Sequence, residues 1–342
     1  MTGRVRLARL TDLAALGELS RLSQQEHVDA RSLGLPVTGP RIGVFSLFRL
    51  PLGAFRPNDL LFVYEDERRL SGLLRVERDA SRDEMTIVEL DAIGSGDSGD
   101  TRFRMVQHLL RDGAKRGAIR FHVACADGQG NVELFMQAGF ARYGQENLLF
   151  RRPREPLPRP WTEEQARDAG IRPCQPLDAV PLARLYASVT PQPVVRLEAY
   201  RLTDWERQGS TTRVPRSSLA PILRFADVEA YVQAAPGESG DLQALLQVGV
   251  AQEEQPHYLK ILAKPGADLG PLVDFGLGLI GARIARGGSC PDSGVLAPVR
   301  TYEAPIDRRL EEAGFAGLAT VTLLMKEAVV RVEEPALVPA VR

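Results

Sequence analysis

A short loop in the second half of the chain has residue types that can bind a phosphate group. It runs Lys264-Pro265-Gly266-Ala267-Asp268-Leu269-Gly270-Pro271, between an apolar strand and an apolar helix. Glycines let the backbone approach an anion closely, and a helix N-terminus presents unpaired N–H groups. An ordinary turn from strand to helix contains the same glycines and prolines, so both interpretations stay open.

Glu89 is a candidate general base. It stands in the middle of the otherwise apolar run Thr86-Ile87-Val88-Glu89-Leu90. A carboxyl group among apolar neighbours has a raised pKa and can take up a proton near neutral pH. The alternation of a strand also allows Glu89 to point into solvent, where it would have no such role.

The histidines and cysteines give weaker signals. His27 and His108 lack partners, and His257 precedes a strand, where a histidine is usually exposed. His122 lies inside a strand beside Val123, which is more typical of a packed side chain than of a ligand. The three cysteines are far apart and no Cys/His cluster exists, so neither a disulfide framework nor a metal site is predicted.

The elements that must position these residues occur twice in the chain. Ala138-Gly139-Phe140-Ala141 matches Ala313-Gly314-Phe315-Ala316, and a pair of leucines follows each copy, all at an offset of 175 positions. An arginine and an aspartate recur near the start of each half at an offset of 166: Arg6 with Asp12, and Arg172 with Asp178. A repeat this long is a whole domain that was duplicated and then diverged.

Both halves have the same predicted order: strand, helix, irregular segment, three strands, helix, strand, helix, strand. This order indicates an α+β fold, in which each half is a mixed, mostly antiparallel sheet flanked by helices. The predicted domains are residues 1–152 and 169–334. Four prolines within residues 151–160 disfavour a regular element, so residues 153–168 are predicted to be a stiff linker.

Composition limits the class of protein. The chain of 342 residues is 44% hydrophobic and 25% charged, which is ordinary for a soluble globular protein of two domains. Its formal net charge of −1 gives no reason to expect a nucleic-acid or membrane partner. The first ten residues are polar and no apolar run suited to a signal peptide follows, so a cytoplasmic location is expected.

The order of elements, with a late helix that ends in Gly-Phe, resembles the GCN5-related N-acetyltransferase (GNAT) superfamily. The resemblance covers most of both halves. In the first half it is carried by Asn131-x-x-Leu134-Phe135-x-x-x-Gly139-Phe140, which is similar to the family's Asn-x-x-Ala-x-x-Tyr-x-x-x-Gly-Phe. The second half keeps Leu310-Glu311-Glu312-Ala313-Gly314-Phe315. The resemblance implies two acyl-CoA N-acyltransferase-like domains in tandem.

The resemblance also implies a mechanism. Acyl-CoA lies where two neighbouring strands splay apart, with its pyrophosphate at the N-terminus of the following helix, and an amine attacks the thioester directly. We therefore expect acetyl-CoA as the donor and a small-molecule or peptide amine as the acceptor. The second half is predicted to hold the donor through its strand-to-helix loop: Leu262, Ala263, Lys264, Gly266, Ala267 and Gly270.

The first half departs from the family at the phosphate loop. Arg104 and Val106 stand at the positions of the family's glycines, and Asp97 and Asp100 just upstream would repel a pyrophosphate. Arg102 and Arg104 can pair with phosphate, or they are solvated arginines on a helix that has lost its ligand.

Both halves also lack the family's proton donor. The tyrosine expected four residues before the glycine is Phe135 in one half and Leu310 in the other, and neither can donate a proton. Tyr302 is the candidate that replaces it, and Tyr143 is a second one. A buried tyrosine is more often a core residue whose hydroxyl is satisfied.

The sequence thus predicts an acyl-CoA-dependent N-acyltransferase with at least one degenerate domain. The alternative is a catalytically inactive tandem protein that binds acyl-CoA or a protein partner. Transfer from an aminoacyl-tRNA is disfavoured by the neutral charge. Four classes of acceptor stay open: aminoglycosides, polyamines, amino acids and protein N-termini.

Overall fold

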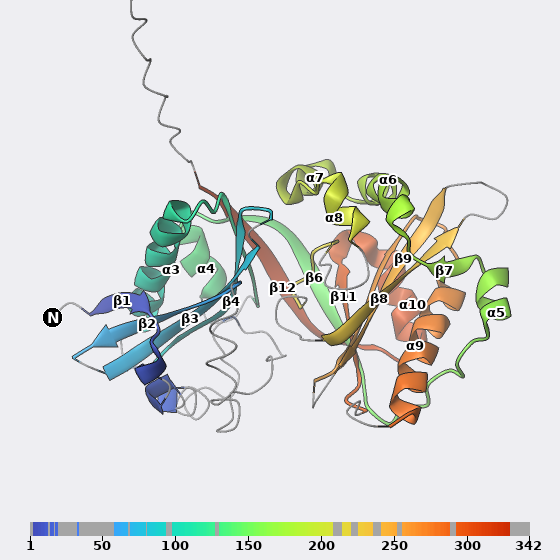
Figure 1. Cartoon of the computed structure of the whole chain (residues 1–342), viewed down its shortest axis with the longest axis horizontal. Helices are drawn as coiled ribbons and strands as arrows, with labels where there is room; N and C mark the ends of the chain where they lie inside the picture. The colour runs from blue at the N-terminus through green and yellow to red at the C-terminus, as the bar shows by residue number, and fades with distance from the viewer. Residues whose placement is uncertain are drawn as a thin grey trace, which may run out of the picture.

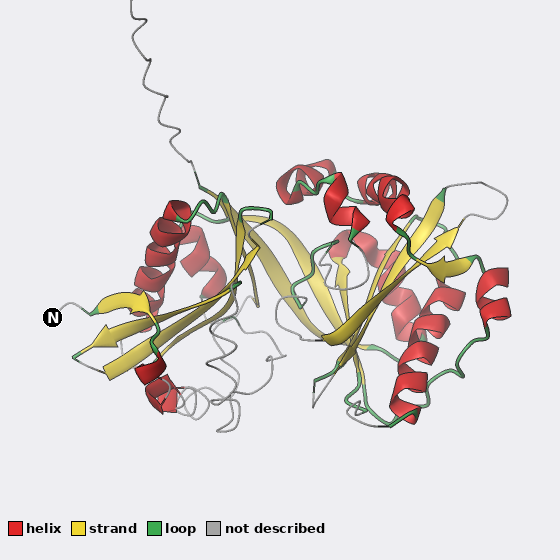
Figure 2. Cartoon of the chain, viewed as in Figure 1, coloured by secondary structure: helices red, strands yellow, loops and turns green. Residues whose placement is uncertain are grey.

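The computed structural model describes residues 3–12, 14–16, 18–19, 33, 58–67, 69–79, 81–93, 98–126, 130–207, 214–219, 225–234, 241–251, 255–287 and 292–328. His27 and Asp97 lie outside these ranges. The described strands form one continuous twelve-stranded sheet in the order β1-β2-β3-β4-β5-β12-β6-β11-β10-β9-β8-β7 (Figure 1). Helices pack on the sheet, which confirms the predicted α+β fold (Figure 2).

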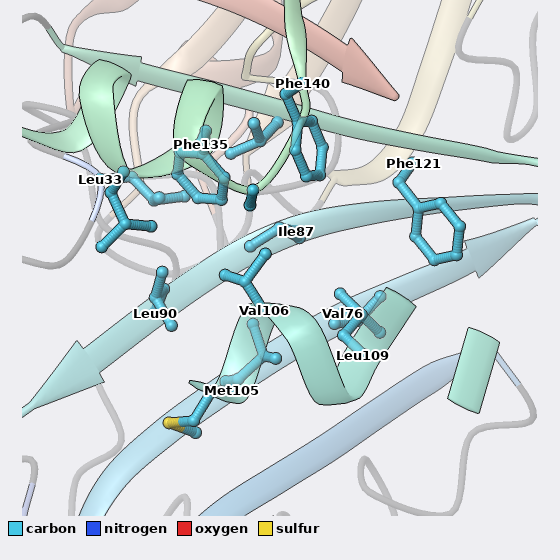
Figure 3. Packing of buried hydrophobic residues seen from close by; sticks show 14 of the residues in the cluster. Leu33, Val76, Ile87, Leu90, Met105, Val106, Leu109, Phe121, Phe135 and Phe140 are labelled. Carbon is cyan, nitrogen blue, oxygen red and sulfur yellow. The ribbon is translucent and has the colours of Figure 1, made fainter. Parts of the chain in front are cut away.

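The described part of the first half supplies six strands, and two helices pack on one face of them. The strands are β1 (Arg4–Leu7), β2 (Asp59–Asp66), β3 (Arg69–Asp79), β4 (Glu84–Ala92), β5 (Arg120–Ala126) and β6 (Ala141–Arg151), and the helices are α3 (Ser98–Lys115) and α4 (Asn131–Gln137). Figure 3 shows Met105, Val106 and Leu109 of α3 in the core beneath them, together with Phe135 and Phe140.

The second half repeats this plan, and helices lie on both faces of its sheet. Its strands are β7 (Ile171–Pro173), β8 (Phe225–Ala234), β9 (Leu242–Ala251), β10 (His257–Ala263), β11 (Val295–Arg300) and β12 (Ala316–Glu327). On one side lie α5 (Glu163–Asp168), α9 (Leu269–Ala285) and α10 (Ala304–Glu312), and on the other α6 (Ala179–Val189), α7 (Gln192–Glu198) and α8 (Leu202–Glu206) (Figure 1). Successive side chains of β9 lie on opposite faces of the sheet: Leu245 packs against α6 and Leu246 against α9.

The two halves exchange their last strands. β12 pairs with β5 of the first half, β6 pairs with β11 of the second, and β6 and β12 pair with each other. Glu146 of β6 lies opposite Val321 of β12, and these two positions are 175 apart, which is the offset of the sequence repeat. An approximate two-fold axis therefore passes between Glu146 and Val321 and relates the halves.

The match near the start of each half proves to be a repeated ion pair. Arg6 donates to both carboxylate oxygens of Asp12 at 2.7 and 2.9 Å, and Arg172 does the same to Asp178 at 2.7 Å twice. Each aspartate also accepts a backbone N–H three residues before it. Two-point contacts of this kind fix the direction of the chain as it leaves the first strand of each half.

The Gly-Phe signature ends a helix in both halves as its residue types predict. Gly139 and Gly314 have φ of 87° and 89°, a left-handed conformation that favours glycine. Phe140 then turns into the core and meets Phe135 edge to face at 5.4 Å (Figure 3). Lys326 of the exchanged strand donates to the carbonyl of Ala138 at 2.9 Å, which places a cation at the end of α4.

Candidate functional site

The parallel strands β4 and β5 form a fork. Their pairing covers only Glu84–Ile87 with Arg120–Val123, although both strands continue beyond it. A β-bulge interrupts β4 at the same level. Ile87 and Glu89 pair with adjacent residues of β3, so Val88 is the additional residue of the bulge. The two strands are therefore hydrogen-bonded up to Ile87 and Val123 and separate beyond these residues.

A small cavity lies where this pairing ends. Its volume is about 20 Å³, room for about one water molecule. The first half and β12 contribute Thr86, Ile87, His122, Val123, Ala124, Tyr143 and Leu323, and the second half contributes Arg216, Ser217 and Ser218. The cavity is thus shared between the two halves.

His122 is the chemically most distinctive residue of this cavity. Its side chain is 3% exposed, and neither ring nitrogen has a hydrogen-bond partner in the described part of the chain. Burial and, to a smaller extent, the charge of Arg216 lower the pKa of His122 to about 4, against the opposing effect of Glu84, which lies 3.7 Å away. The imidazole is therefore neutral near pH 7 and able to accept a proton.

Tyr143 lies next to His122 and keeps its proton. The two rings meet edge to face with centroids 6.4 Å apart. Burial raises the pKa of Tyr143 to about 12, so its hydroxyl is a hydrogen-bond donor at neutral pH.

Glu84 anchors one side of the cavity. Arg82 donates to its two oxygens at 3.1 and 3.0 Å, Arg216 donates to Oε2, and Arg120 lies 3.4 Å from Oε1. Burial alone would raise the pKa of Glu84, but His122 and the arginines outweigh it and hold that pKa well below its usual value. Glu84 is therefore a structural carboxylate rather than a proton acceptor.

A segment of the second half, residues 214–219, covers the fork of the first. Arg216 donates to Thr86 at 3.0 Å, and the backbone N–H of Ser218 donates to Glu146 at 2.7 Å. Arg300 of β11 also anchors this segment by donating to the backbone carbonyl of Arg216 at 2.7 Å. We call residues 214–219 the covering segment.

The corresponding fork in the second half is filled. β10 and β11 pair only at His257–Tyr258 with Val295–Leu296, so they separate as β4 and β5 do. The register places Tyr258 where the first half has Thr86, and Leu296 where it has His122. Tyr258 and Leu296 belong to a buried apolar cluster, and Lys260 donates across the gap to Pro298 at 3.2 Å.

The predicted donor loop of the second half is one strand-to-helix turn, with most of its polar groups already engaged. Lys264 pairs with Asp241 at 2.5 Å, and Asp268 accepts the N–H of Gly270 at 3.1 Å. Gly266 has a φ of 87° and open space around it, and Ala267 closes the turn by donating to the carbonyl of Lys264. Leu262 is buried and Ala263 is paired to β9. Donor binding here stays a prediction.

The N-terminus of α3 in the first half is no better suited to a pyrophosphate than the loop of the second half. Asp100 stands in its first turn and pairs with Arg104 at 2.6 Å. Arg102 turns away and donates to Asn131 of α4 at 2.8 Å. Both helix N-termini that the fold offers to a phosphate thus carry an aspartate.

The predicted base and acid lie away from the cavity. Glu89 is one residue past the bulge in β4 and lies 3.8 Å from Arg75 on the neighbouring strand. Tyr302 follows β11 in a short 3-10 helix, η3 (Thr301–Glu303), and burial raises its pKa. Neither is among the residues that line the cavity, and their catalytic roles stay predictions.

The sequence offers Tyr143 as a candidate, favours a packed role for His122 and gives no signal for Arg216. One signal could have identified His122. The matched position of the second half is Leu296, so a histidine at an otherwise apolar position of the repeat is unusual. Phe135 and Leu310 are core residues, as their types suggest. No group of residues suited to a metal ion occurs among the described residues. None of the described helices has the length and apolar character needed to span a membrane.

Comparison with known proteins supports the fold. No family model matches the sequence, and no curated protein matches it. A tandem GNAT protein from the clavulanic acid biosynthesis pathway, 12% identical, superposes with a TM-score of 0.53 over 95% of this chain and 98% of that one. A GCN5-related N-acetyltransferase from Sphaerobacter thermophilus, also 12% identical, gives 0.54 over 95% of each chain. The chain therefore has the tandem GNAT fold, as its sequence predicts.

Proposed function

We propose that this protein is an acyl-CoA-dependent N-acyltransferase that uses acetyl-CoA and reacts at the fork between β4 and β5. One observation carries the proposal: the first fork holds a cavity lined by a neutral His122 whose ring nitrogens make no hydrogen bond among the described residues, whereas the second fork is filled by Tyr258, Leu296 and Lys260. One half thus keeps a polar cavity at its fork, and the other half serves as its support.

The residues of the cavity suit direct transfer. The amine nitrogen forms a bond to the thioester carbonyl carbon, the carbon–sulfur bond breaks, and His122 takes the proton that the amine loses. Tyr143 keeps its proton and can donate a hydrogen bond to the departing sulfur. The covering segment excludes water from the fork, which strengthens these interactions.

A catalytically inactive tandem protein is the second candidate. It is favoured by the aspartates at the two helix N-termini, Asp100 and Asp268, because they occupy the place of a pyrophosphate. Such a protein would use the GNAT fold to bind another molecule.

Calorimetric titration of the whole chain with acetyl-CoA tests the proposal. Thr86→Tyr gives the first fork the residue of the second, and we expect it to abolish binding. Lys264→Ala removes the lysine of the predicted second-half loop and should leave binding intact. The reverse pattern would place the donor in the second half, and no binding to the wild type would favour the inactive protein. Thermal unfolding verifies that both variants fold.

A further inference from the structure

Buried polar atoms without partners surround the cavity of the first fork. In the described part of the chain, no hydrogen bond is made by Arg216 Nε, by Ser218 Oγ or by either ring nitrogen of His122. All three side chains line the cavity. Buried polar groups are almost always satisfied in folded proteins, so four such atoms on three side chains of one cavity favour a polar ligand there.

The chemistry of these atoms defines what that ligand offers. Arg216 Nε is a donor, the Ser218 hydroxyl can donate, and neutral imidazole has one N–H. The other two nitrogens of the guanidinium are held by Thr86 and Glu84, so Arg216 cannot turn away. A small group rich in acceptor oxygens satisfies this set, and a carboxylate does so with a charge opposite to that of Arg216.

Cationic acceptors fit this environment poorly. The ammonium groups of polyamines and aminoglycosides donate hydrogen bonds and accept none, so they would leave Arg216 Nε unsatisfied.

We propose that the fork recognises a carboxylate on the amine acceptor, so that the acceptor is an amino acid. Arg216 and Ser218 of the second half hold the carboxylate, and His122 of the first half receives the proton of the neighbouring amine. In an α-amino acid the two groups are attached to one carbon, so a carboxylate held by Arg216 and Ser218 brings the amine close to His122, which lines the same cavity. The inference rests on the proposed function and assigns the covering segment to acceptor recognition.

The test measures binding of N-acetyl-L-alanine, which has the carboxylate, against N-acetyl-L-alaninamide, which is neutral and of the same shape. Titrated into the whole chain without acetyl-CoA, the acid should bind at least tenfold more tightly than the amide. Ser218→Ala should weaken the acid severalfold and leave the amide unchanged. Ser218 Oγ makes no hydrogen bond, so this variant should fold normally.

Ser188→Ala is the matched control, because Ser188 lies on α6 with its hydroxyl bonded to Leu185. It should bind the acid as the wild type does. Equal binding of acid and amide, or an unchanged Ser218→Ala variant, would overturn the inference. Binding of the acid without any binding of acetyl-CoA would reject the proposed function and leave a carboxylate site.

A carboxylate can also come from a dicarboxylic acyl donor, and turnover separates the two sources. With L-alanine and acetyl-CoA, product formation supports an amino-acid acceptor. Product formation only with succinyl-CoA and L-alaninamide would move the carboxylate to the donor and overturn the assignment to the acceptor.

Discussion

Lys260 and Glu303 form a buried ion pair within the second half. Nζ lies 3.1 Å from Oε2, with side-chain exposures of 1% and 5%. Lys260 belongs to β10, and its second bond, to Pro298, reaches β11 on the far side of the fork. The pair therefore closes the second fork from within, where the first fork has a cavity.

Lys260→Met is expected to destabilise the protein strongly. The substitution leaves Glu303 buried without its cation, which costs about 3–5 kcal/mol in other proteins. Urea unfolding of wild type and variant measures the difference. The double variant Lys260→Met, Glu303→Gln should regain much of the lost stability. An unchanged urea midpoint for the single variant would contradict the role of the pair.

His122→Leu is expected to lower kcat/KM for acetyl transfer about 10²–10⁴-fold, the usual contribution of a general base. The variant copies Leu296 of the second half and removes no hydrogen bond, so its stability should remain high. Steady-state kinetics with acetyl-CoA check this prediction. Glu89→Gln is the comparison, and a larger loss there than at His122 would restore Glu89 as the base.

The stability of the protein should fall as the pH drops from about 6.5 to about 4. The folded state holds the pKa of His122 at about 4 against an unfolded value of 6.5, so the unfolded chain binds a proton first. The loss approaches about 3 kcal/mol at pH 4, at 1.36 kcal/mol for each pKa unit. Urea unfolding at several pH values measures it, and His122→Leu should lose this part of the slope.

Arg216→Ala is expected to destabilise the contact between the halves by about 1.5–3 kcal/mol, the range for hydrogen bonds to charged groups. It removes the bonds of the covering segment to Glu84 and Thr86, both on β4. Arg104→Ala breaks only an exposed pair within α3 and should cost less than about 1 kcal/mol. Thermal unfolding compares the two, and equal effects would argue against the covering segment as a clamp.

Residues 1–152 expressed alone should not form a stable monomer. Without β12, the strands β5 and β6 each lose their central partner and expose unpaired edges. Sedimentation and amide exchange would detect association or loss of structure. Adding residues 153–342 should restore the native sheet, and a well-folded monomer from the first half alone would show that strand exchange is dispensable.

Much of the fold could be predicted because its signals are local. The signals are the dense apolar run Leu60–Tyr64, the helix that ends at Gly139 and the Arg6–Asp12 spacing, and each depends on residues close together in the chain. The exchange of β6 and β12 could not be predicted. An exchanged strand has the same hydrophobic pattern as one that stays in its own half, and only pairing across more than a hundred residues distinguishes them.

The sequence by itself determined that the protein is a diverged duplication and which fold each half has, because the repeat and its helix-Gly-Phe signature survive in the residues. Only the tertiary structure decided which fork stays open. Whether a fork contains a cavity depends on the residue at one equivalent position, which is Thr86 in the first half and Tyr258 in the second. It also depends on the covering segment. His122 and Arg216 come together through strand pairing and packing between the halves, and no local pattern in the sequence records such contacts.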